Sequence, residues 1–196
     1  MTGVQTCALP ILRLVEKGAG QVILLSRGLA DTGSRSERLT WLLETGNVRL
    51  VQVDVTDQAQ IATALRDTLP IDAVFHAAGM STQVAFEQLT VDEVFRVQAS
   101  KTEGTLALFN AAQTLGAGRF ITFSSISSLW GVPQLAHYAS ANRYQDAFAS
   151  RPGLPGPQVL NINWGPWGGD SMASAESLIA FERNGIQGQI GRAACR

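Results

Sequence analysis

The chain has 196 residues, of which 45% are hydrophobic and 16% are charged, a balance that suits one folded domain and excludes a disordered chain. Its formal net charge of −1 gives no argument for a surface that binds nucleic acid. No apolar run reaches the roughly 18–20 residues of a membrane-spanning helix, so we expect a cytoplasmic protein that binds neither nucleic acid nor membrane.

Strands and helices are predicted to alternate along the chain. Apolar or alternating runs predict five strands, at residues 21–26, 48–54, 71–79, 119–125 and 158–165. Amphipathic patterns predict helices over residues 36–44, 58–67, 91–115 and 137–149. Residues 12–18 resemble the end of an earlier helix, and residues 151–157 (RPGLPGP) predict a turn. Strands separated by helices imply parallel βαβ units in an α/β fold, a doubly wound parallel sheet of the Rossmann type.

The two ends differ from the middle of the chain. Residues 2–11 (TGVQTCALPI) match the translation of a common sequencing adapter, and residues 188–196 (GQIGRAACR) resemble adapter read-through in the other orientation. We therefore expect residues 1–11 and 188–196 to be artefacts and residues 12–187 to be part of a larger domain. The alternative is a genuine but unusual N-terminus.

A nucleotide-binding sheet of this kind normally begins with a strand, a G-x-G-x-x-G-like loop and a helix. The residues before position 12 do not have that pattern. In the strand order 3-2-1-4-5-6 the first strand is central, and the helix after it binds the pyrophosphate. We therefore expect the chain as written to lack its first strand, to fold poorly and to bind its cofactor poorly.

Residues suited to a ligand site follow each predicted strand. Ligands bind such sheets at the carboxyl ends of the strands. The residues at those positions are Arg27, Asp54, Ala77–Gly79, Ser124–Ser125 and Gly165–Pro166. Each is ordinary for a strand end when taken alone, but five in register predict a ligand site. No metal site is indicated, because the chain has only two cysteines near opposite ends and only two histidines.

Four residues predict a catalytic site. Tyr138 and Asn142 are spaced i, i+4 on a predicted helix and share one face, while Ser125 ends a strand. A phenol can donate its proton to a developing alkoxide, and a cation such as Lys101 eases that transfer. Ser125 can orient a substrate carbonyl by hydrogen bonding. Each residue alone also has a structural explanation, as a core tyrosine, a solvated lysine or a strand-end serine.

Over residues 12–186 the sequence resembles the short-chain dehydrogenase/reductases, and within them the ketoreductase domains of modular polyketide synthases. The matching motifs are VILLSR (22–27), VDVTD (53–57), FHAAG (75–79), SKTEGTLALF (100–109), FSSISSLWG (123–131), HYASAN (137–142) and NWGPW (163–167). Most short-chain reductases carry Y-x-x-x-K. Here Asn142 holds the lysine position and Lys101 lies in the preceding helix, an exchange typical of polyketide-type ketoreductases.

The resemblance implies a role for each site residue. Tyr138 would donate the proton, Ser125 would orient the carbonyl, and Lys101 and Asn142 would complete the tetrad. NADPH is the implied cofactor, with Arg27 at its 2′-phosphate. The other implied cofactor residues are Asp54 and Val55 at the adenine, Ala78 and Gly79 beside the ribose, and Gly165 and Pro166 at the nicotinamide.

The implied reaction is hydride transfer to the 3-keto group of an acyl chain, giving a 3-hydroxyacyl thioester. The implied partners are the acyl carrier protein that tethers the chain through phosphopantetheine, and the other domains of the same synthase. Trp130 resembles the marker of enzymes that form the L-configured alcohol, and residues 77–83 lack the Leu-Asp-Asp of the opposite group. The alternative for Trp130 is an aromatic residue that only packs along the substrate groove.

Two other functions stay open from the sequence. A stand-alone short-chain dehydrogenase or nucleotide-sugar epimerase is disfavoured by Asn142. A non-catalytic, structural reductase-like module is disfavoured by the presence of Ser125, Tyr138 and Lys101 together.

Overall fold

The structure is a computed structural model that describes residues 11, 13–28, 37–68, 70–167, 175–183 and 185–188. Internal contacts divide the chain into two compact units, each with its own sheet. The central unit is Asp54–Trp164, and the terminal unit combines Met1–Val53 with Gly165–Arg196. Apart from residues 11 and 188, the two adapter-like ends lie outside the described residues.

A two-stranded parallel sheet is the framework of the terminal unit. In chain order the labelled elements of this unit are β1 (Val22–Ser26), α2 (Glu37–Glu44), β2 (Val48–Gln52) and α7 (Ala175–Arg183). β1 pairs with β2 so that Val22 lies opposite Val48. Leu42 of α2 is 1% exposed and packs with Val48 and Ile11 in an apolar core, which anchors the helix to the sheet.

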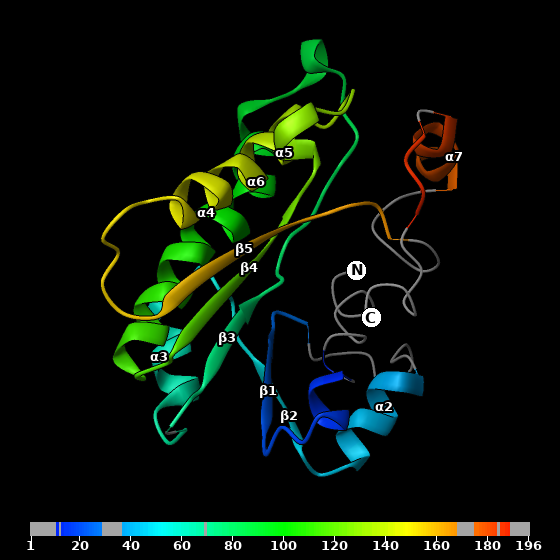
Figure 1. Cartoon of the computed structure of the whole chain (residues 1–196). Helices are drawn as coiled ribbons and strands as arrows, with labels where there is room; N and C mark the ends of the chain where they lie inside the picture. Colours follow the sequence, from blue (N-terminus) through cyan, green and yellow to red (C-terminus); the bar gives the residue numbers. More distant parts are fainter. Residues whose placement is uncertain are drawn as a thin grey trace. The chain divides into compact units, whose positions relative to one another are not determined.

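The central unit contains a three-stranded parallel sheet. Its elements are α3 (Gln58–Leu65), β3 (Ala73–His76), the 3-10 helix η1 (Phe86–Gln88), α4 (Val91–Thr114), β4 (Arg119–Ser125), α5 (Ser127–Trp130), α6 (Ala136–Ala149) and β5 (Gln158–Trp164). The strands lie in the order β3-β4-β5 (Figure 1). Their register places His76, Thr122 and Asn161 in one row. Since side chains alternate along a strand, the residues of one row share a face of the sheet.

Helices α4 and α6 lie side by side against this sheet (Figure 1). The ring of Phe109 on α4 meets the rings of Phe120 on β4 and Phe148 on α6 edge to face, with centroids 5.4 and 5.1 Å away. Two and four residues further along β4, the same face carries the buried side chains of Thr122 and Ser124. The face under the helices therefore changes from apolar to polar toward the carboxyl ends of the strands.

Capping residues fix where two helices begin. Asp57 accepts hydrogen bonds from the backbone N–H groups of Ala59 and Gln60 at 2.9 and 3.0 Å, and α3 starts at the next residue. Thr90 accepts one from the N–H of Glu93 at 3.2 Å and starts α4. These side chains satisfy backbone donors that the helix itself leaves free.

The predicted α/β class with parallel strands is confirmed. In the terminal unit β1 pairs with β2, and in the central unit the three strands lie in the order in which they follow along the chain. β4 has the predicted bounds, but β2 and β3 are shorter than predicted. The chain turns after β2 because the carboxylate of Asp54 accepts a hydrogen bond from the backbone of Thr56 at 3.0 Å. The sequence analysis did not predict η1, α5 or α7.

Candidate functional site

Ser125 is the last residue of β4 and is held at both its hydroxyl and its carbonyl. Its hydroxyl accepts a hydrogen bond from the backbone N–H of Ser127, the first residue of α5, at 3.2 Å. Its carbonyl accepts hydrogen bonds from the hydroxyl of Ser128 at 2.8 Å and the side-chain amide of Asn163 at 3.3 Å. Both the strand end and the turn into α5 are therefore fixed around this serine.

Tyr138 and Asn142 lie one turn apart on α6. Asn142 is fully buried, and its side-chain amide donates to the backbone carbonyl of Tyr138 at 2.8 Å. Burial raises the pKa of the Tyr138 phenol above its ordinary value, while hydrogen bonding with the side chains of Asn142 and Ser125 acts in the opposite direction. The structure therefore brings these three predicted residues together where β4 ends and α6 begins.

Lys101 is buried on α4, with 4% of its surface exposed. Its ammonium group donates to the backbone carbonyl of Phe123 at 2.7 Å and to the side-chain oxygen of Gln145 at 3.1 Å. Gln145 is fully buried and donates in turn to the hydroxyl of Thr105 at 3.2 Å. These neutral acceptors offset the cost of burying the positive charge. One of them, the carbonyl of Phe123, lies two residues before Ser125.

The end of β3 lies close to the same lysine. Burial, together with the positive charge of Lys101, lowers the pKa of His76 to about 3, so the imidazole is neutral at ordinary pH. A Cβ atom at Gly79 would stand 2.9 Å from Cε of Lys101. The absence of a side chain at position 79 is therefore what lets Lys101 lie where it does.

Four of the predicted cofactor residues belong to the central unit. Asp54 turns the chain by accepting hydrogen bonds from both the backbone N–H and the hydroxyl of Thr56. Val55 is buried against α4, where a Cβ atom at Gly104 would stand 3.2 Å from its Cγ2. Ala78, like its neighbour Gly79, is partly buried in the segment after β3.

The other three predicted cofactor residues belong to the terminal unit. Arg27 directly follows β1 and is exposed, and its backbone carbonyl accepts a hydrogen bond from the side chain of Gln52 at 3.1 Å. This contact joins the ends of β1 and β2. Gly165 and Pro166 directly follow β5 and are partly buried.

Trp130, predicted to border a substrate groove, is the last residue of α5 and is 69% exposed. Gly131 ends this helix with a φ of +68°, a backbone conformation that suits glycine.

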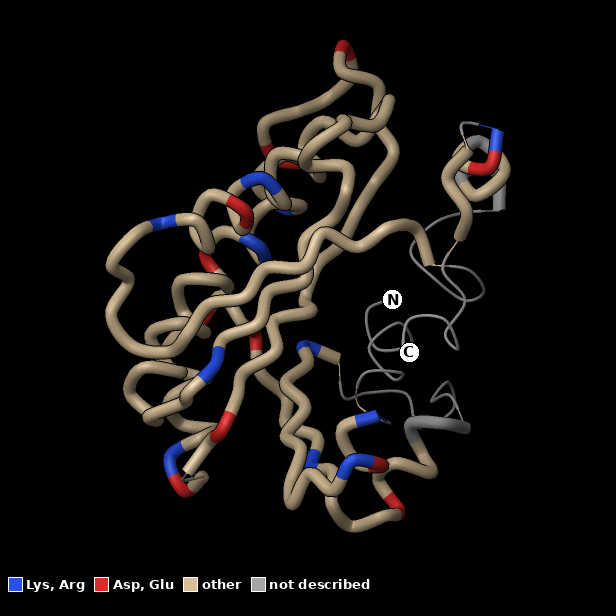
Figure 2. Tube along the Cα trace, in the orientation of Figure 1, with Lys and Arg blue, Asp and Glu red and all other residues tan. Residues whose placement is uncertain are grey.

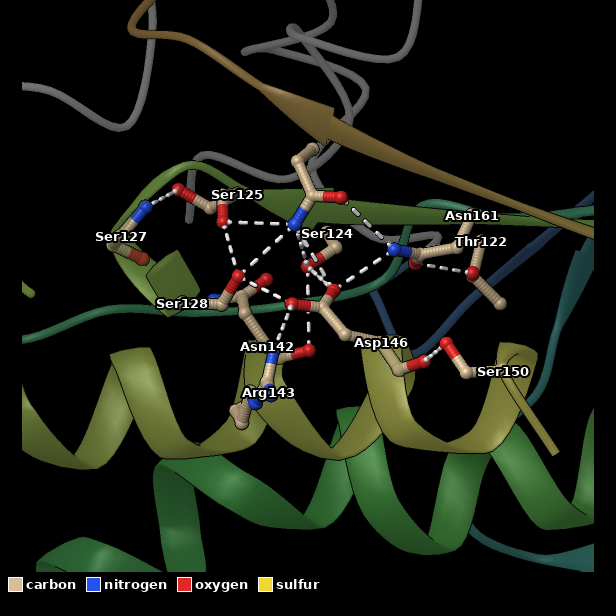
Figure 3. Close-up of polar contacts among 11 residues, drawn as sticks. Thr122, Ser124, Ser125, Ser127, Ser128, Asn142, Arg143, Asp146, Ser150 and Asn161 are labelled. Carbon is tan, nitrogen blue, oxygen red and sulfur yellow. Dashed lines mark hydrogen bonds and ion pairs between the residues drawn. The ribbon is translucent and has the colours of Figure 1, made fainter. Parts of the chain in front are cut away.

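The sequence analysis missed Asp146 and Gln145. Asp146 continues the i, i+4 row of Tyr138 and Asn142 by one more turn, a signal that could have identified it. Its carboxylate accepts hydrogen bonds from the side chains of Ser124, Ser128, Asn161 and Asn163, of which the first three are labelled in Figure 3. Burial alone would raise the pKa of Asp146, but these hydrogen bonds outweigh it and hold that pKa below its ordinary value. No sequence signal separates Gln145 from an exposed helical glutamine.

Helices α4 and α6 carry both acidic and basic residues (Figure 2). Among the described residues, no helix is long and apolar enough to cross a membrane. Within that same set, no three His, Cys, Asp or Glu side chains are grouped so that they could hold a metal ion.

A family model described as the KR domain matches residues 8–169. Among curated proteins, erythronolide synthase EryA3 of Saccharopolyspora erythraea is 37% identical over 180 residues, which cover 89% of this chain and 6% of that protein. The chain therefore spans a small part of this relative's length.

Two solved structures have a similar fold. The ketoreductase PlmKR1, from the first module of phoslactomycin biosynthesis in Streptomyces sp. HK803, gives a TM-score of 0.83 at 32% identity, covering 95% of this chain and 44% of that one. A structure of A-type ketoreductases from a modular polyketide synthase gives a TM-score of 0.85 at 28% identity, covering 95% and 41%. The chain spans less than half of either solved chain.

Proposed function

Because the chain belongs to the KR domain family, we propose that it reduces the 3-keto group of an acyl thioester to a 3-hydroxyacyl thioester with NADPH. The acyl chain is tethered through phosphopantetheine to an acyl carrier protein, and the other domains of the same synthase are its neighbours. One observation carries the proposal: the side chains of Ser125 and Asn142 both act on the phenol of Tyr138.

Tyr138 donates the proton that the substrate oxygen needs. A pKa raised by burial keeps the phenol protonated at neutral pH, which is the form that donates. As negative charge develops on the substrate oxygen, the phenol moves its proton to that atom. Asn142 supports this role because its amide binds the carbonyl of Tyr138 and fixes the first turn of α6.

Ser125 orients the substrate carbonyl. Its hydroxyl oxygen accepts from the backbone of Ser127, which leaves its own proton to donate, to the phenol of Tyr138 at rest and to a substrate oxygen when one is bound. A donor fixed before the reaction stabilises the developing charge without having to reorganise.

Lys101 supplies the positive charge of the proposed site, because its buried ammonium group is bonded to the backbone of Phe123, two residues before Ser125. Its ammonium group stays in place through its bonds to Phe123 and Gln145. The lysine therefore acts through its charge, while Tyr138 carries out the proton transfer.

We propose NADPH as the cofactor, which when bound would supply the hydride. Arg27 offers an exposed guanidinium at the carboxyl end of β1, a group suited to two-point contact with the 2′-phosphate. Gly79 presents bare backbone next to Lys101. The residues that would complete the cofactor site are Asp54, Val55, Ala78, Gly165 and Pro166.

The product is the L-configured alcohol, a proposal supported by the exposed indole of Trp130 at the end of α5. A bulky ring there restricts the side from which an acyl chain enters. Chiral chromatography of the product tests this directly, and a D-configured alcohol would reject the assignment.

The activity test begins with long-read resequencing of the locus across both ends of the chain. The product of the complete reading frame, called here the full-frame protein, is then assayed for NADPH oxidation with a 3-ketoacyl thioester. We expect turnover by the wild type and a loss of about 10²–10⁴-fold in kcat in Tyr138→Phe.

Tyr144→Phe is the matched control, because Tyr144 also lies on α6 but stacks on Phe148 instead. It should keep near-normal turnover. Normal turnover by Tyr138→Phe would refute the assigned mechanism. An absence of turnover by a folded, NADPH-binding wild type would favour a non-catalytic module.

A further inference from the structure

We propose that Asp146 is a positioning residue for Ser125: its carboxylate holds the end of β4 and the start of α5 so that the Ser125 hydroxyl faces Tyr138. The kinetic consequence of this inference rests on the proposed function. Its geometric basis is the set of hydrogen bonds around Asp146.

The carboxylate of Asp146 ties three other elements to α6 (Figure 3). Its Oδ1 atom accepts from the hydroxyl of Ser124 on β4 at 2.6 Å, and from the side-chain amides of Asn161 and Asn163 on β5 at 2.8 and 3.0 Å. Its Oδ2 atom accepts from the hydroxyl of Ser128 on α5. A single side chain therefore fixes where two strand ends and a short helix meet.

Two of these donors also reach Ser125. The hydroxyl of Ser128 lies 2.8 Å from the carbonyl oxygen of Ser125, and the amide nitrogen of Asn163 lies 3.3 Å from it. A hydroxyl has one proton, so Ser128 donates to either Asp146 or Ser125 at a given moment, whereas the two N–H groups of Asn163 can serve both. Asp146 is therefore linked to the backbone of Ser125 by two hydrogen bonds through one intervening side chain, that of Asn163.

Asp146 acts through that backbone because its carboxylate binds the hydroxyl of Ser124, whereas the Ser125 hydroxyl accepts from the backbone of Ser127. Fixing the Ser125 carbonyl restricts the backbone at the end of β4, and that backbone sets the direction of the Ser125 hydroxyl.

A carboxylate is the right group for this position because it only accepts hydrogen bonds, and all four of its side-chain partners donate. Its charge is met by these donors and by Arg143, whose guanidinium lies 3.8 Å from Oδ2 and is 64% exposed. Asp146→Asn keeps the shape but turns one acceptor into a donor, so Ser128 or Ser124 loses its partner.

The first test needs no turnover. The full-frame protein is labelled with ¹³C at the tyrosine Cζ atoms, and the signals of Tyr138 and Tyr144 are assigned with the two Tyr→Phe variants. Because the hydrogen bond with Ser125 acts on the phenol of Tyr138, Asp146→Asn should shift the Tyr138 signal and leave that of Tyr144 unchanged. Ser150→Ala is the matched control, because the Ser150 hydroxyl binds only the backbone carbonyl of Asp146, at 2.8 Å.

The result that overturns the inference is an unmoved Tyr138 signal in Asp146→Asn, or equal shifts at both tyrosines, which would indicate a general loss of packing. If Asp146→Asn does not fold, Asn163→Ala removes the side chain that can bind both Asp146 and Ser125 at once, without changing the charge. It should then give the same selective shift at Tyr138, and its failure to do so counts equally against the inference.

The second test is a double-mutant cycle with Ser125→Ala in the ketoreductase assay. If Asp146 acts through Ser125, Asp146→Asn should lower kcat about 10-fold or more in the wild type, and less than about 2-fold in Ser125→Ala. NADPH affinity should stay unchanged in both. The same loss in both backgrounds would show that Asp146 acts independently of Ser125. A wild type without turnover would reject the proposed function, and the labelling result would still decide the role of Asp146.

Discussion

Gln145 accepts a hydrogen bond at 3.1 Å from the ammonium group of Lys101, and neither side chain is more than 4% exposed. The pair joins α6 to α4 next to β4, where Lys101 also binds the carbonyl of Phe123. A neutral amide therefore helps to hold the charge that the proposed mechanism uses. Replacing Gln145 therefore tests whether activity depends on the position of the ammonium group as well as on its presence.

Gln145→Leu should destabilise the full-frame protein by about 1–3 kcal/mol, since a buried charged donor loses an acceptor. It should also lower kcat/KM, because the ammonium group is no longer held behind Ser125. Denaturant unfolding and the reductase assay measure the two effects. Gln98→Leu is the control: Gln98 also bridges α4 to α6, by donating to Ser140 at 2.7 Å, but at the surface. Equal losses in both variants would contradict the prediction.

Gly79→Ala should displace Lys101, because the new Cβ atom would lie 2.9 Å from Cε of that lysine. The lysine is buried and bonded at its tip, so the strain should cost about 1–3 kcal/mol and most of the activity. At Gly118 a Cβ atom would meet only the carbonyl of Asp72, at 3.6 Å, so Gly118→Ala should be mild. Denaturant unfolding of the two variants measures the difference. Equal free energies of unfolding for Gly79→Ala and Gly118→Ala would contradict the close contact at position 79.

Stability should fall as the pH drops below the ordinary pKa of histidine. Burial and the charge of Lys101 lower the pKa of His76 from 6.5 to about 3, so between these values the unfolded chain binds a proton that the folded chain does not. From pH 7 to pH 5 this mismatch should cost about 2 kcal/mol. The free energy of unfolding at both pH values measures it, and the difference should shrink in His76→Gln. If the wild type has the same free energy of unfolding at both pH values, the pKa of His76 is not lowered in the folded chain and the prediction is wrong.

Arg27→Ala should lower the preference of the full-frame protein for NADPH over NADH by about 10–100-fold, the worth of a charge-assisted bond to phosphate. The ratio of kcat/KM with the two cofactors measures the effect. Arg49→Ala is the control, because Arg49 is an exposed arginine in the same two-stranded sheet but near the start of β2, away from the carboxyl ends of the strands. An unchanged ratio in Arg27→Ala would remove this residue from the cofactor site.

Local patterns predicted the elements well but not the contacts between them. The bounds of β4 are as predicted, because its alternation persists to Ser125. β2 was predicted too long, because hydrophobicity continues past the point where Asp54 turns the chain. The pair Tyr138 and Asn142 could be predicted because helical spacing is a local property.

Asp146 could not be assigned a role in the same way, although its spacing is the same. Its partners come from β4, α5 and β5, up to 22 positions away in sequence. Only the assembled sheet shows that four donors surround it. Gln145 has the same limitation, since its partner Lys101 lies 44 positions away. Sequence patterns predict on which face of a helix or strand a residue lies, but not which residues of other elements it contacts.

The two adjacent serines of β4 show that a residue's role can depend on its exact position along a strand. Ser124 and Ser125 are chemically identical, and only the pleat decides that one is bound by Asp146 while the other faces Tyr138. Inserting or deleting a single residue within β4 would exchange their tasks, since a slip of one position turns every side chain to the opposite face. Length variation in this region of the chain is therefore tolerable in the turn at residues 151–157, but not within the strand.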